Sequence, residues 1–481
     1  MTDVFLAIDA GTTSLRALIV DSGGAILGKG RTDLQSTYPA PGCVEQDAEG
    51  VWRQTLLVIE KALDNAGFEK ADLTAIGVTT QRSSAVVWDK STGNAVAPML
   101  VWSDLRGSGR AEELQAKGFF ITPQMAAAKL EGLVEIAMAS GGISHMDQLA
   151  WGNIDSFLIS KLSGGKHITD ASQAIATGYL DVFKMDWNPG LVAEQGLEAL
   201  DFPVIGDSWG ELATTSKAAF GAEVPITALI ADQQCAMMGH GCITPGDAKI
   251  TYGTSGTFNV NTGKELKLVS PSIVPWVQYA LGGVPTFCLE GMVVTAGAIF
   301  DWLAGGLELV SSAAASQSLA NSVPDCGGVF VLPALQGVGA PHGRLDQKAL
   351  IGGLSRASTK AHIVRAAHEG VAFRVKEIID AVYSATDIAV PQQISVDGGA
   401  TENDLLMQIQ ADMLALPVAR HAVREATAYG AALCAGLGAG AFALSDIPEF
   451  VQHDRIFEPR LSPDEAATQL KLWQANVYAG A

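Results

Sequence analysis

The sequence predicts an α/β protein built from two lobes of similar design, and three observations support this fold class. The 481 residues are 48% hydrophobic and 17% charged, which is enough apolar material for extensive buried cores. Apolar, strand-like runs alternate with stretches of helical periodicity. A pattern of strand, glycine- and hydroxyl-rich turn, and strand occurs near the start of the chain and again after residue 246.

The first lobe is expected to open with three strands around tight turns. The next stretch has helical spacing, with Val51, Leu56, Ile59 and Leu63 on one face and Asp47 placed to cap its first turn. A buried strand follows. The order strand, strand, strand, helix, strand resembles one ribonuclease-H-like unit, with its elements expected at 4–10, 15–21, 24–33, 47–67 and 73–81.

A second unit of the same design is expected to begin after Pro245–Gly246. Residues 247–263 repeat the strand, turn and strand, although this turn has no acid, and residues 393–414 follow as strand, glycine turn and helix. The similarity lies in pattern rather than in sequence identity. The predicted division of the chain is therefore 1–246 and 247–481.

The first turn joins an acid to glycine and three hydroxyls, because Asp9 is followed closely by Gly11, Thr12, Thr13 and Ser14. Backbone N–H groups in such a turn can cradle an anion. An acid that faces a phosphate makes sense with a divalent cation between them, so Asp9 is a candidate magnesium ligand. The alternative from these residues alone is a hairpin whose acid caps the turn.

Two further glycine turns favour nucleotide binding. Residues 252–258 read Tyr-Gly-Thr-Ser-Gly-Thr-Phe, and the strand within 396–403 ends in two glycines before a helix. Glycine permits close approach of the backbone to a ligand, and a helix N-terminus favours a polar group. Three such turns at wide spacing suit a nucleotide held between two lobes.

A carboxylate at a strand-to-helix junction is the candidate catalytic group. Asp232 follows an apolar run and precedes a helix of small residues, a position that points into a cleft in open α/β sheets. There it could accept the proton of a hydroxyl that attacks phosphorus; the alternative is an ordinary helix N-cap. Arg82, Trp102 and Asp104 lie near strand ends and suit a small polyhydroxy compound, or else form a surface ion pair over a core tryptophan.

Charge and composition exclude several classes of partner. The formal net charge of −20 repels nucleic acid and anionic membranes, so neither is expected to bind. The N-terminus has no basic region followed by an apolar run, so no secretion signal is expected, and the uncharged run 426–444 is expected to be a buried helix or helix pair rather than a membrane span. The six scattered cysteines are expected to be buried thiols rather than a zinc or redox site, so we expect a cytoplasmic protein.

Beyond these physical arguments, the chain resembles the FGGY-type carbohydrate kinases from end to end, and it is closest in pattern to the glycerol kinases among them. Residues 353–373 resemble the carboxy-terminal signature of that family. The other stretches that carry the resemblance include DAGTTSLRALIVD, TTQRSSAVVWDKSTG, VWSDLR, ADQQCAMMGHG, YGTSGTF, LEGMVVTAGAIFDWL and VDGGATENDLLMQIQADML.

The resemblance implies two actin-like (ribonuclease-H-like) lobes around an interlobe cleft. It assigns sugar or polyol binding and the first phosphate loop to 1–246, and nucleotide binding to 247–481. It implies ATP and Mg²⁺ as cofactors, a small carbohydrate as the substrate and a homodimer as the assembly, with Asp232 matching the general base and Asp9 the magnesium-associated aspartate. The positions that match nucleotide contacts are Thr12, Thr13, Ser14, Arg16, Thr254, Gly297, Asp301, Gly399 and Asn403. The positions that match acceptor contacts are Arg82, Ser83, Trp102, Gln124, Asp232 and Gln233.

Three positions depart from the glycerol-kinase pattern. Asp301 stands where those enzymes usually carry a glutamine, Ser83 where they carry an acid, and Gln124 where they carry a tyrosine. A site that hydrogen-bonds the hydroxyl groups of its substrate can discriminate between substrates by about 10⁴ to 10⁵. The changes at positions 83 and 124 therefore argue against glycerol as the best substrate. The sequence thus predicts an ATP-dependent kinase that acts on a longer polyol or a ketose. The alternatives are a glycerol kinase proper, a kinase of a cyclitol or sugar acid, and a catalytically silent nucleotide-binding sugar sensor.

Overall fold

The computed structural model describes residues 3–140 and 142–479, which divide into two compact units. Among these residues, unit 1 takes those within Met1–Gly241, Trp276–Thr286 and Glu425–Phe450. Unit 2 takes those within Cys242–Pro275, Phe287–Arg424 and Val451–Ala481. Two segments that lie after residue 246 therefore belong to unit 1. The functional division at 246 stays a prediction.

Unit 1 is built on a six-stranded mixed sheet. In spatial order, its strands are β13 (Trp209–Thr214), β14 (Pro225–Ala231), β5 (Ala75–Thr80), β1 (Val4–Ala10), β2 (Ser14–Asp21) and β3 (Ile26–Asp33). Strands β1, β2 and β3 form an antiparallel meander, β5 runs parallel to β1, and β14 runs parallel to β5. The first four predicted strands are thus confirmed.

Helix α1 (Ala48–Ala66) covers one face of this sheet and buries Val51, Ile59 and Leu63, as the periodicity predicts. Asp47 stands at its N-cap position, but the prediction that it caps the helix is wrong. Its carboxylate instead accepts a hydrogen bond of 3.0 Å from the Arg53 guanidinium, because that charged donor competes with the backbone N–H groups.

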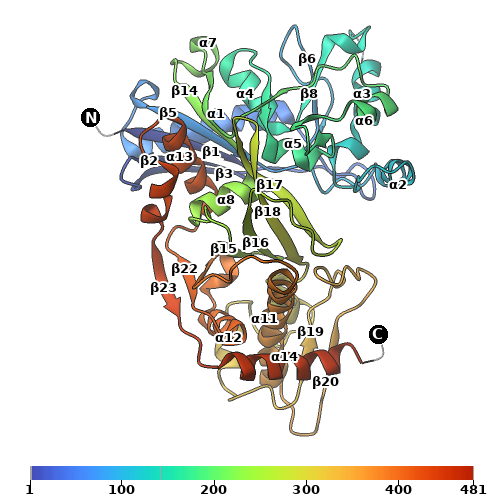
Figure 1. Ribbon diagram of the computed structural model, residues 1–481, viewed down its shortest axis with the longest axis vertical. Helices are drawn as coiled ribbons and strands as arrows, with labels where there is room; N and C mark the ends of the chain where they lie inside the picture. The colour runs from blue at the N-terminus through green and yellow to red at the C-terminus, as the bar shows by residue number, and fades with distance from the viewer. Residues whose placement is uncertain (1–2, 141, 480–481) are drawn as a thin grey trace. The chain divides into compact units, whose positions relative to one another are not determined.

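Helix α13 (Ala426–Gly438) is the glycine- and alanine-rich run, and it is buried from Ala428 to Leu437. Figure 1 shows it, in red, beside the blue strands β1 and β2, and it also packs on helix α8 (Asp232–Gly239). A Cβ atom added to Gly430 would lie 2.0 Å from a carbonyl oxygen of α8, so close packing explains the glycine. Across the described residues, every helix is too short or too polar to span a membrane.

The rest of unit 1 consists of short elements, many of which surround a separate cluster of buried side chains. These elements are β4 (Glu45–Gln46), β6 (Val86–Asp89), β7 (Met99–Leu100), α2 (Ser108–Ala116), α3 (Leu130–Ala139), β8 (Leu149–Gly152), α4 (Ile154–Ser163), β9 (Ile168–Asp170), α5 (Ala171–Thr177), β10 (Leu180–Asp181), β11 (Asp186–Trp187), α6 (Pro189–Glu194), β12 (Val204–Gly206) and α7 (Lys217–Phe220).

Unit 2 repeats the sheet design of unit 1, which confirms the predicted second copy. The strands, in spatial order, are β17 (Ile273–Leu281), β18 (Val284–Val293), β16 (Gly256–Gly263), β15 (Ala248–Tyr252), β21 (Ile394–Asp397), β22 (Val418–His421) and β23 (His453–Phe457). Residues 276–281 of β17 and 284–286 of β18 fall in unit 1. Strands β18, β16 and β15 are antiparallel, and β21 and β22 continue the sheet in parallel.

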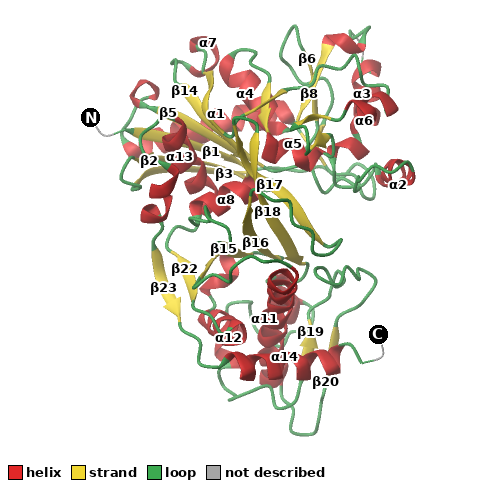
Figure 2. Ribbon diagram, in the orientation of Figure 1, coloured by secondary structure: helices red, strands yellow, loops and turns green. Residues whose placement is uncertain are grey.

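The helices of unit 2 lie beside this sheet and a small pair of strands. They are α9 (Ala298–Gly305), α10 (Ser316–Ala320), α11 (Lys360–Ala385), α12 (Asp404–Leu414) and α14 (Pro463–Val477), and the pair is β19 (Phe330–Leu332) with β20 (Leu350–Gly352). In Figure 2, α11 lies next to α12, and both α11 and α14 contact β19. All six cysteines are free thiols, but Cys43 and Cys326 are only half-buried, so the prediction of buried thiols holds for the other four.

Candidate active site

The first glycine turn places Asp9 at the end of β1, directly across the hairpin from Arg16 on β2. The carboxylate is 3% exposed and accepts a hydrogen bond of 3.0 Å from the Arg16 guanidinium. Burial raises the pKa of Asp9 to about 6; Arg16 lowers it and the nearby Asp232 carboxylate raises it. The arginine predicted beside the phosphate loop is thus the counter-ion of the predicted magnesium ligand.

A chain of hydrogen bonds joins this turn to the predicted acceptor residues. The Trp102 indole N–H donates to the Thr12 hydroxyl over 2.9 Å, and that hydroxyl donates to the Gln81 side chain over 3.1 Å. Gln46 in turn donates to the Thr12 carbonyl over 2.7 Å. Trp102 remains 45% exposed, so part of the residue is open to a ligand. Two predicted groups, one for phosphate and one for the acceptor, are therefore neighbours.

Asp232 is the first residue of α8, directly after β14 ends. Ala231, not Asp232, occupies the N-cap position, which argues against the simple capping alternative. The Asp232 carboxylate lies 3.6 Å from the Arg82 guanidinium and accepts a hydrogen bond of 2.7 Å from the backbone N–H of Gln233. Arg82 also stacks over the ring of Trp276, 5.0 Å from its centroid. The structure thus brings Arg82, Asp232 and Gln233 together and adds Trp276, which the sequence reasoning missed.

The two departures from the glycerol-kinase pattern have different surroundings. Ser83 is buried in a left-handed conformation (φ 58°), and its hydroxyl donates to the Ala176 carbonyl over 2.6 Å. Gln124 is exposed, and its carbonyl accepts a hydrogen bond of 3.1 Å from the buried ammonium of Lys129. The same ammonium donates to the carbonyl of residue 101 over 2.6 Å. Lys129 therefore ties the loop of Gln124 to the segment that carries Trp102.

Asp104 does not belong to the acceptor site that the sequence suggested. Its side chain is fully buried, accepts a hydrogen bond from the backbone N–H of Val44 over 2.7 Å, and pairs with the Arg106 guanidinium over 2.8 Å. Arg106 also pairs with Glu45 over 2.7 Å. Asp104 is thus occupied by a structural ion-pair network, because a nearer arginine at position 106 competes for it.

In unit 2, the second glycine turn and Gly297 are held together by backbone hydrogen bonds. The Gly297 N–H donates to the Gly253 carbonyl over 2.9 Å, and the Thr254 carbonyl accepts from Ala296 over 3.0 Å. A Cβ atom on Gly297 would lie 2.4 Å from the Gly253 carbonyl oxygen, so only glycine fits. Thr254 itself is exposed. Two predicted nucleotide contacts are thus adjacent.

The third glycine turn carries the remaining nucleotide candidates. Gly399 is exposed, with open space where a side chain would be, and it begins a 3₁₀ turn that leads into Asn403. The Asn403 side chain caps α12 by accepting from the Leu406 N–H over 3.0 Å, and its amide donates to Nε2 of His368 over 2.8 Å. Asp301 is exposed on the first turn of α9.

His368 is buried, and sequence reasoning missed it. Its Nδ1 bonds to the Val364 carbonyl over 2.8 Å, which fixes the hydrogen on Nδ1 and leaves Nε2 as an acceptor for Asn403. The ring also packs on Phe300 of α9, with 4.4 Å between ring centroids. Burial lowers the pKa of His368 to about 4, so the ring is neutral near pH 7.

The donor set at the first turn fits a magnesium–nucleotide complex. Among residues 3–140 and 142–479, no three His, Cys, Asp or Glu side chains cluster as a metal-binding group. Mg²⁺ does not need such a cluster, because it usually takes one or two carboxylates, substrate phosphates and water. Asp9 supplies a buried carboxylate beside the glycine–hydroxyl turn, and a cation there would offset the burial that raises its pKa.

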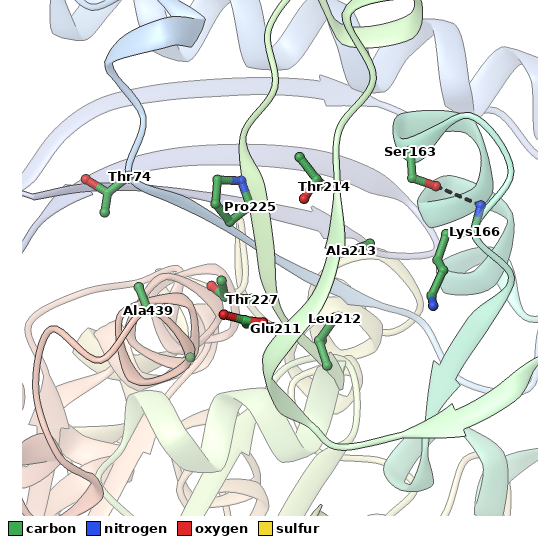
Figure 3. Close-up of a pocket in the computed structure, with 11 residues that line it drawn as sticks. Thr74, Ser163, Lys166, Glu211, Leu212, Ala213, Thr214, Pro225, Thr227 and Ala439 are labelled. Atoms are coloured by element: carbon green, nitrogen blue, oxygen red, sulfur yellow. Dashed lines mark hydrogen bonds between the residues drawn. The ribbon is translucent and has the colours of Figure 1, made fainter.

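A cavity of about 680 Å³ lies elsewhere in unit 1, at the edge of the sheet (Figure 3). Strands β13 and β14 and the end of α13 line it, together with Ser163 and Lys166. The backbone N–H of Lys166 donates to the Ser163 hydroxyl over 2.9 Å, which the dashed line marks. None of the residues that line the cavity is a predicted site residue.

Comparison with known proteins agrees with this geometry. The N-terminal domain of the FGGY family of carbohydrate kinases matches residues 4–239, and its C-terminal domain matches residues 248–439. A glycerol kinase from Acinetobacter baylyi is 39% identical over 97% of this chain and 97% of its own length.

Solved structures give the same result. A glycerol kinase from Plasmodium falciparum with ADP is 26% identical, with a TM-score of 0.91 over 99% of this chain and 98% of that one. A xylulose kinase from Rhodospirillum rubrum is 23% identical, with a TM-score of 0.85 over 98% and 99% of the two chains, and supports the fold alone. Each of the two family domains matches one half of the chain, and together they span nearly all of it. The chain therefore belongs to the FGGY family of carbohydrate kinases, which are ATP-dependent phosphotransferases with the two-domain α/β fold described above.

Proposed function

We propose that this protein transfers the γ-phosphate of ATP to a hydroxyl group of a small polyol, with glycerol as the first acceptor to test. The observation that carries the proposal is the pair formed by Asp232 and Arg82, two partly exposed charges 3.6 Å apart beside the Asp9 carboxylate. The full-length similarity to glycerol kinases favours glycerol over the longer polyol or ketose that the sequence predicted.

In the proposed reaction, Asp232 accepts the proton of the acceptor hydroxyl as its oxygen bonds to the γ-phosphorus and the bond to ADP breaks. Arg82 and Trp102 hold the acceptor, and Thr12, Thr13 and Ser14 hold phosphate oxygens. Bound Mg²⁺, with Asp9 as a ligand, supplies positive charge to the phosphates. Positioning and electrostatic stabilisation supply most of the acceleration in such transfers.

The nucleotide is proposed to bind unit 2 through Thr254, Gly297, Gly399 and Asn403. The exposed turns at Thr254 and Gly399 support this assignment, and the ADP complex of the related Plasmodium glycerol kinase supports an adenine nucleotide as the ligand. Asp301 is proposed to face the edge of the adenine base of the nucleotide. The expected homodimer and the cytoplasmic location stay predictions.

The test is a panel of acceptors with coupled detection of ADP. The panel holds glycerol, polyols of four to six carbons and the common ketoses, and a reaction without acceptor measures futile ATP hydrolysis. The proposal expects glycerol-dependent ADP release well above that background. ATP binding without turnover on any acceptor would contradict it and would favour the silent sugar sensor.

A longer polyol or a ketose is the second candidate, and one observation favours it. Position 83 carries no carboxylate, and the Ser83 hydroxyl already donates to the Ala176 carbonyl, so it offers substrate hydroxyls less hydrogen bonding than an acid would. A kcat/KM for a longer acceptor that exceeds the value for glycerol at least tenfold would establish this candidate instead.

A further inference from the structure

We propose that Asp170 and Ser172 are positioning residues: they hold the end of strand β14 and thereby fix the place of the Asp232 carboxylate. This inference rests on the proposed role of Asp232 as general base. Asp232 follows β14, so the placement of the last residues of this strand sets the placement of the carboxylate. The catalytic value of a base depends on such placement, because a shift of about 1 Å can cost about 10²-fold in rate.

The end of β14 lacks a strand partner on one side. Strand β13 pairs with β14 from Pro225 to Ala228 and goes no further. Backbone N–H groups of alternate residues point to the same side of a strand, so those of Leu229 and Ala231 face beyond the end of β13. Buried N–H groups need acceptors, and residues outside β13 must supply them here.

Two serines supply the acceptors: Ser208, which directly precedes β13, and Ser172 of α5. The Leu229 N–H donates to the backbone carbonyl of Ser208 over 2.9 Å. The Ala231 N–H donates to the side-chain hydroxyl of Ser172 over 2.8 Å. Ser172 and Ser208 are both fully buried, so water does not compete for these hydrogen bonds.

One carboxylate holds both serines. Asp170 is fully buried, and its Oδ1 accepts from the Ser172 hydroxyl over 2.8 Å while its Oδ2 accepts from the Ser208 hydroxyl over 2.7 Å. Oδ1 also accepts from the Gln173 N–H over 3.0 Å, which caps α5. The Asp170 side chain therefore holds both serines that accept hydrogen bonds from Leu229 and Ala231. These are the last two N–H groups on this side of β14 before Asp232.

The same network reaches the segment that carries Trp276. The Ala280 N–H donates to the Ser208 hydroxyl over 3.0 Å, and the Ser208 N–H donates to the Ala280 carbonyl over 2.9 Å. Trp276 lies four residues earlier and stacks on Arg82, the partner of Asp232. Asp170 thus links two segments that meet at the Arg82–Asp232 pair.

The chain offers a matched control close by. The Thr169 hydroxyl donates to the Asp155 carboxylate over 2.7 Å, and both residues are buried, but neither is bonded to β14. Ser172→Ala and Thr169→Val each remove one buried hydroxyl that serves a buried carboxylate. Both variants are expected to lower Tm, but only the first removes the acceptor of the Ala231 N–H.

The experiment measures kcat, the KM for ATP, the KM for the acceptor and Tm in the full-length protein. Ser172→Ala is expected to lower kcat about tenfold or more with both KM values within about threefold of wild type, whereas Thr169→Val keeps kcat within about twofold. If Ser172→Ala does not fold, Ser172→Cys keeps the shape with a weaker hydrogen-bonding atom, and its kcat is expected to fall severalfold.

Two results would overturn the inference: a wild-type kcat in the folded Ser172 variant, or an equal loss of kcat in Thr169→Val. Both are distinct from failure of the proposed function, which would appear as absence of acceptor-dependent ADP release in the wild-type protein. The wild-type assay therefore precedes the comparison of the variants.

Discussion

The raised pKa of Asp9 predicts a pH dependence of magnesium–nucleotide binding. The carboxyl has a pKa of about 6 in the folded protein against 3.8 ordinarily, mainly because it is buried. A magnesium ion needs the ionised form, so affinity is full well above pH 6, is half lost near pH 6 and falls further as Asp9 takes up its proton. For a group with this pKa, the protonated form outweighs the ionised form about tenfold at pH 5, so the Mg²⁺-dependent affinity is expected to fall about tenfold between pH 7.5 and pH 5.

The assay is titration of the protein with ADP at a series of pH values, with and without Mg²⁺. The terminal phosphate of ADP also titrates near pH 6, so the informative quantity is the difference between wild type and Asp9→Asn. The variant is expected to bind Mg–ADP weakly at every pH and to lack the contribution of Asp9. The reasoning would be refuted if wild type and Asp9→Asn lost affinity in parallel as the pH falls.

Three further predictions follow from the described contacts. Ser83→Glu combined with Gln124→Tyr is expected to raise kcat/KM for glycerol, since the carboxylate can accept from acceptor hydroxyls; an unchanged value in the coupled assay would place specificity elsewhere. His368→Leu removes the acceptor of the Asn403 amide and is expected to raise the Kd of ADP severalfold in calorimetry, whereas an equal rise in acceptor KM would contradict a nucleotide-specific role. Burial lowers the pKa of Lys129 to about 7 from 10.5, so between these pH values the unfolded chain binds more protons than the folded chain, and the stability of the fold rises with pH. The Tm of wild type relative to Lys129→Met should therefore increase from pH 7 to pH 10. Parallel Tm curves for the two proteins would contradict this prediction.

Local sequence patterns predicted much of the fold, because they report local physics. The apolar, strand-like runs predicted β1, β2, β3 and β5, the helical spacing predicted α1, and the glycine–hydroxyl turns predicted the repeat in unit 2. What they could not predict is which distant segments join each unit. Helix α13 belongs to unit 1, although it lies near the end of the sequence, because its small residues match a close approach to α8.

The candidate site was predicted unevenly for a related reason. Asp9, Asp232 and the three turns stand at strand ends, which a sequence can reveal. Asp104 looked equally suitable, but Arg106 holds it in a buried network. Partners such as His368 and the Asp170–Ser172 pair are fixed by contacts between segments far apart along the chain. The one sequence signal at His368 is a histidine that shares the apolar face of an amphipathic helix with Val364, Ala367 and Val371.

The most direct test of the whole account is the kcat of Asp232→Asn with its best acceptor. The substitution removes the proton acceptor but keeps the shape, and the ion pair with Arg82 is partly exposed, so the variant is expected to fold and to bind ATP. General-base catalysis contributes about 10² to 10⁴ in rate, and kcat is predicted to fall by that amount while the Kd of ATP changes little. A kcat within tenfold of wild type would contradict the account.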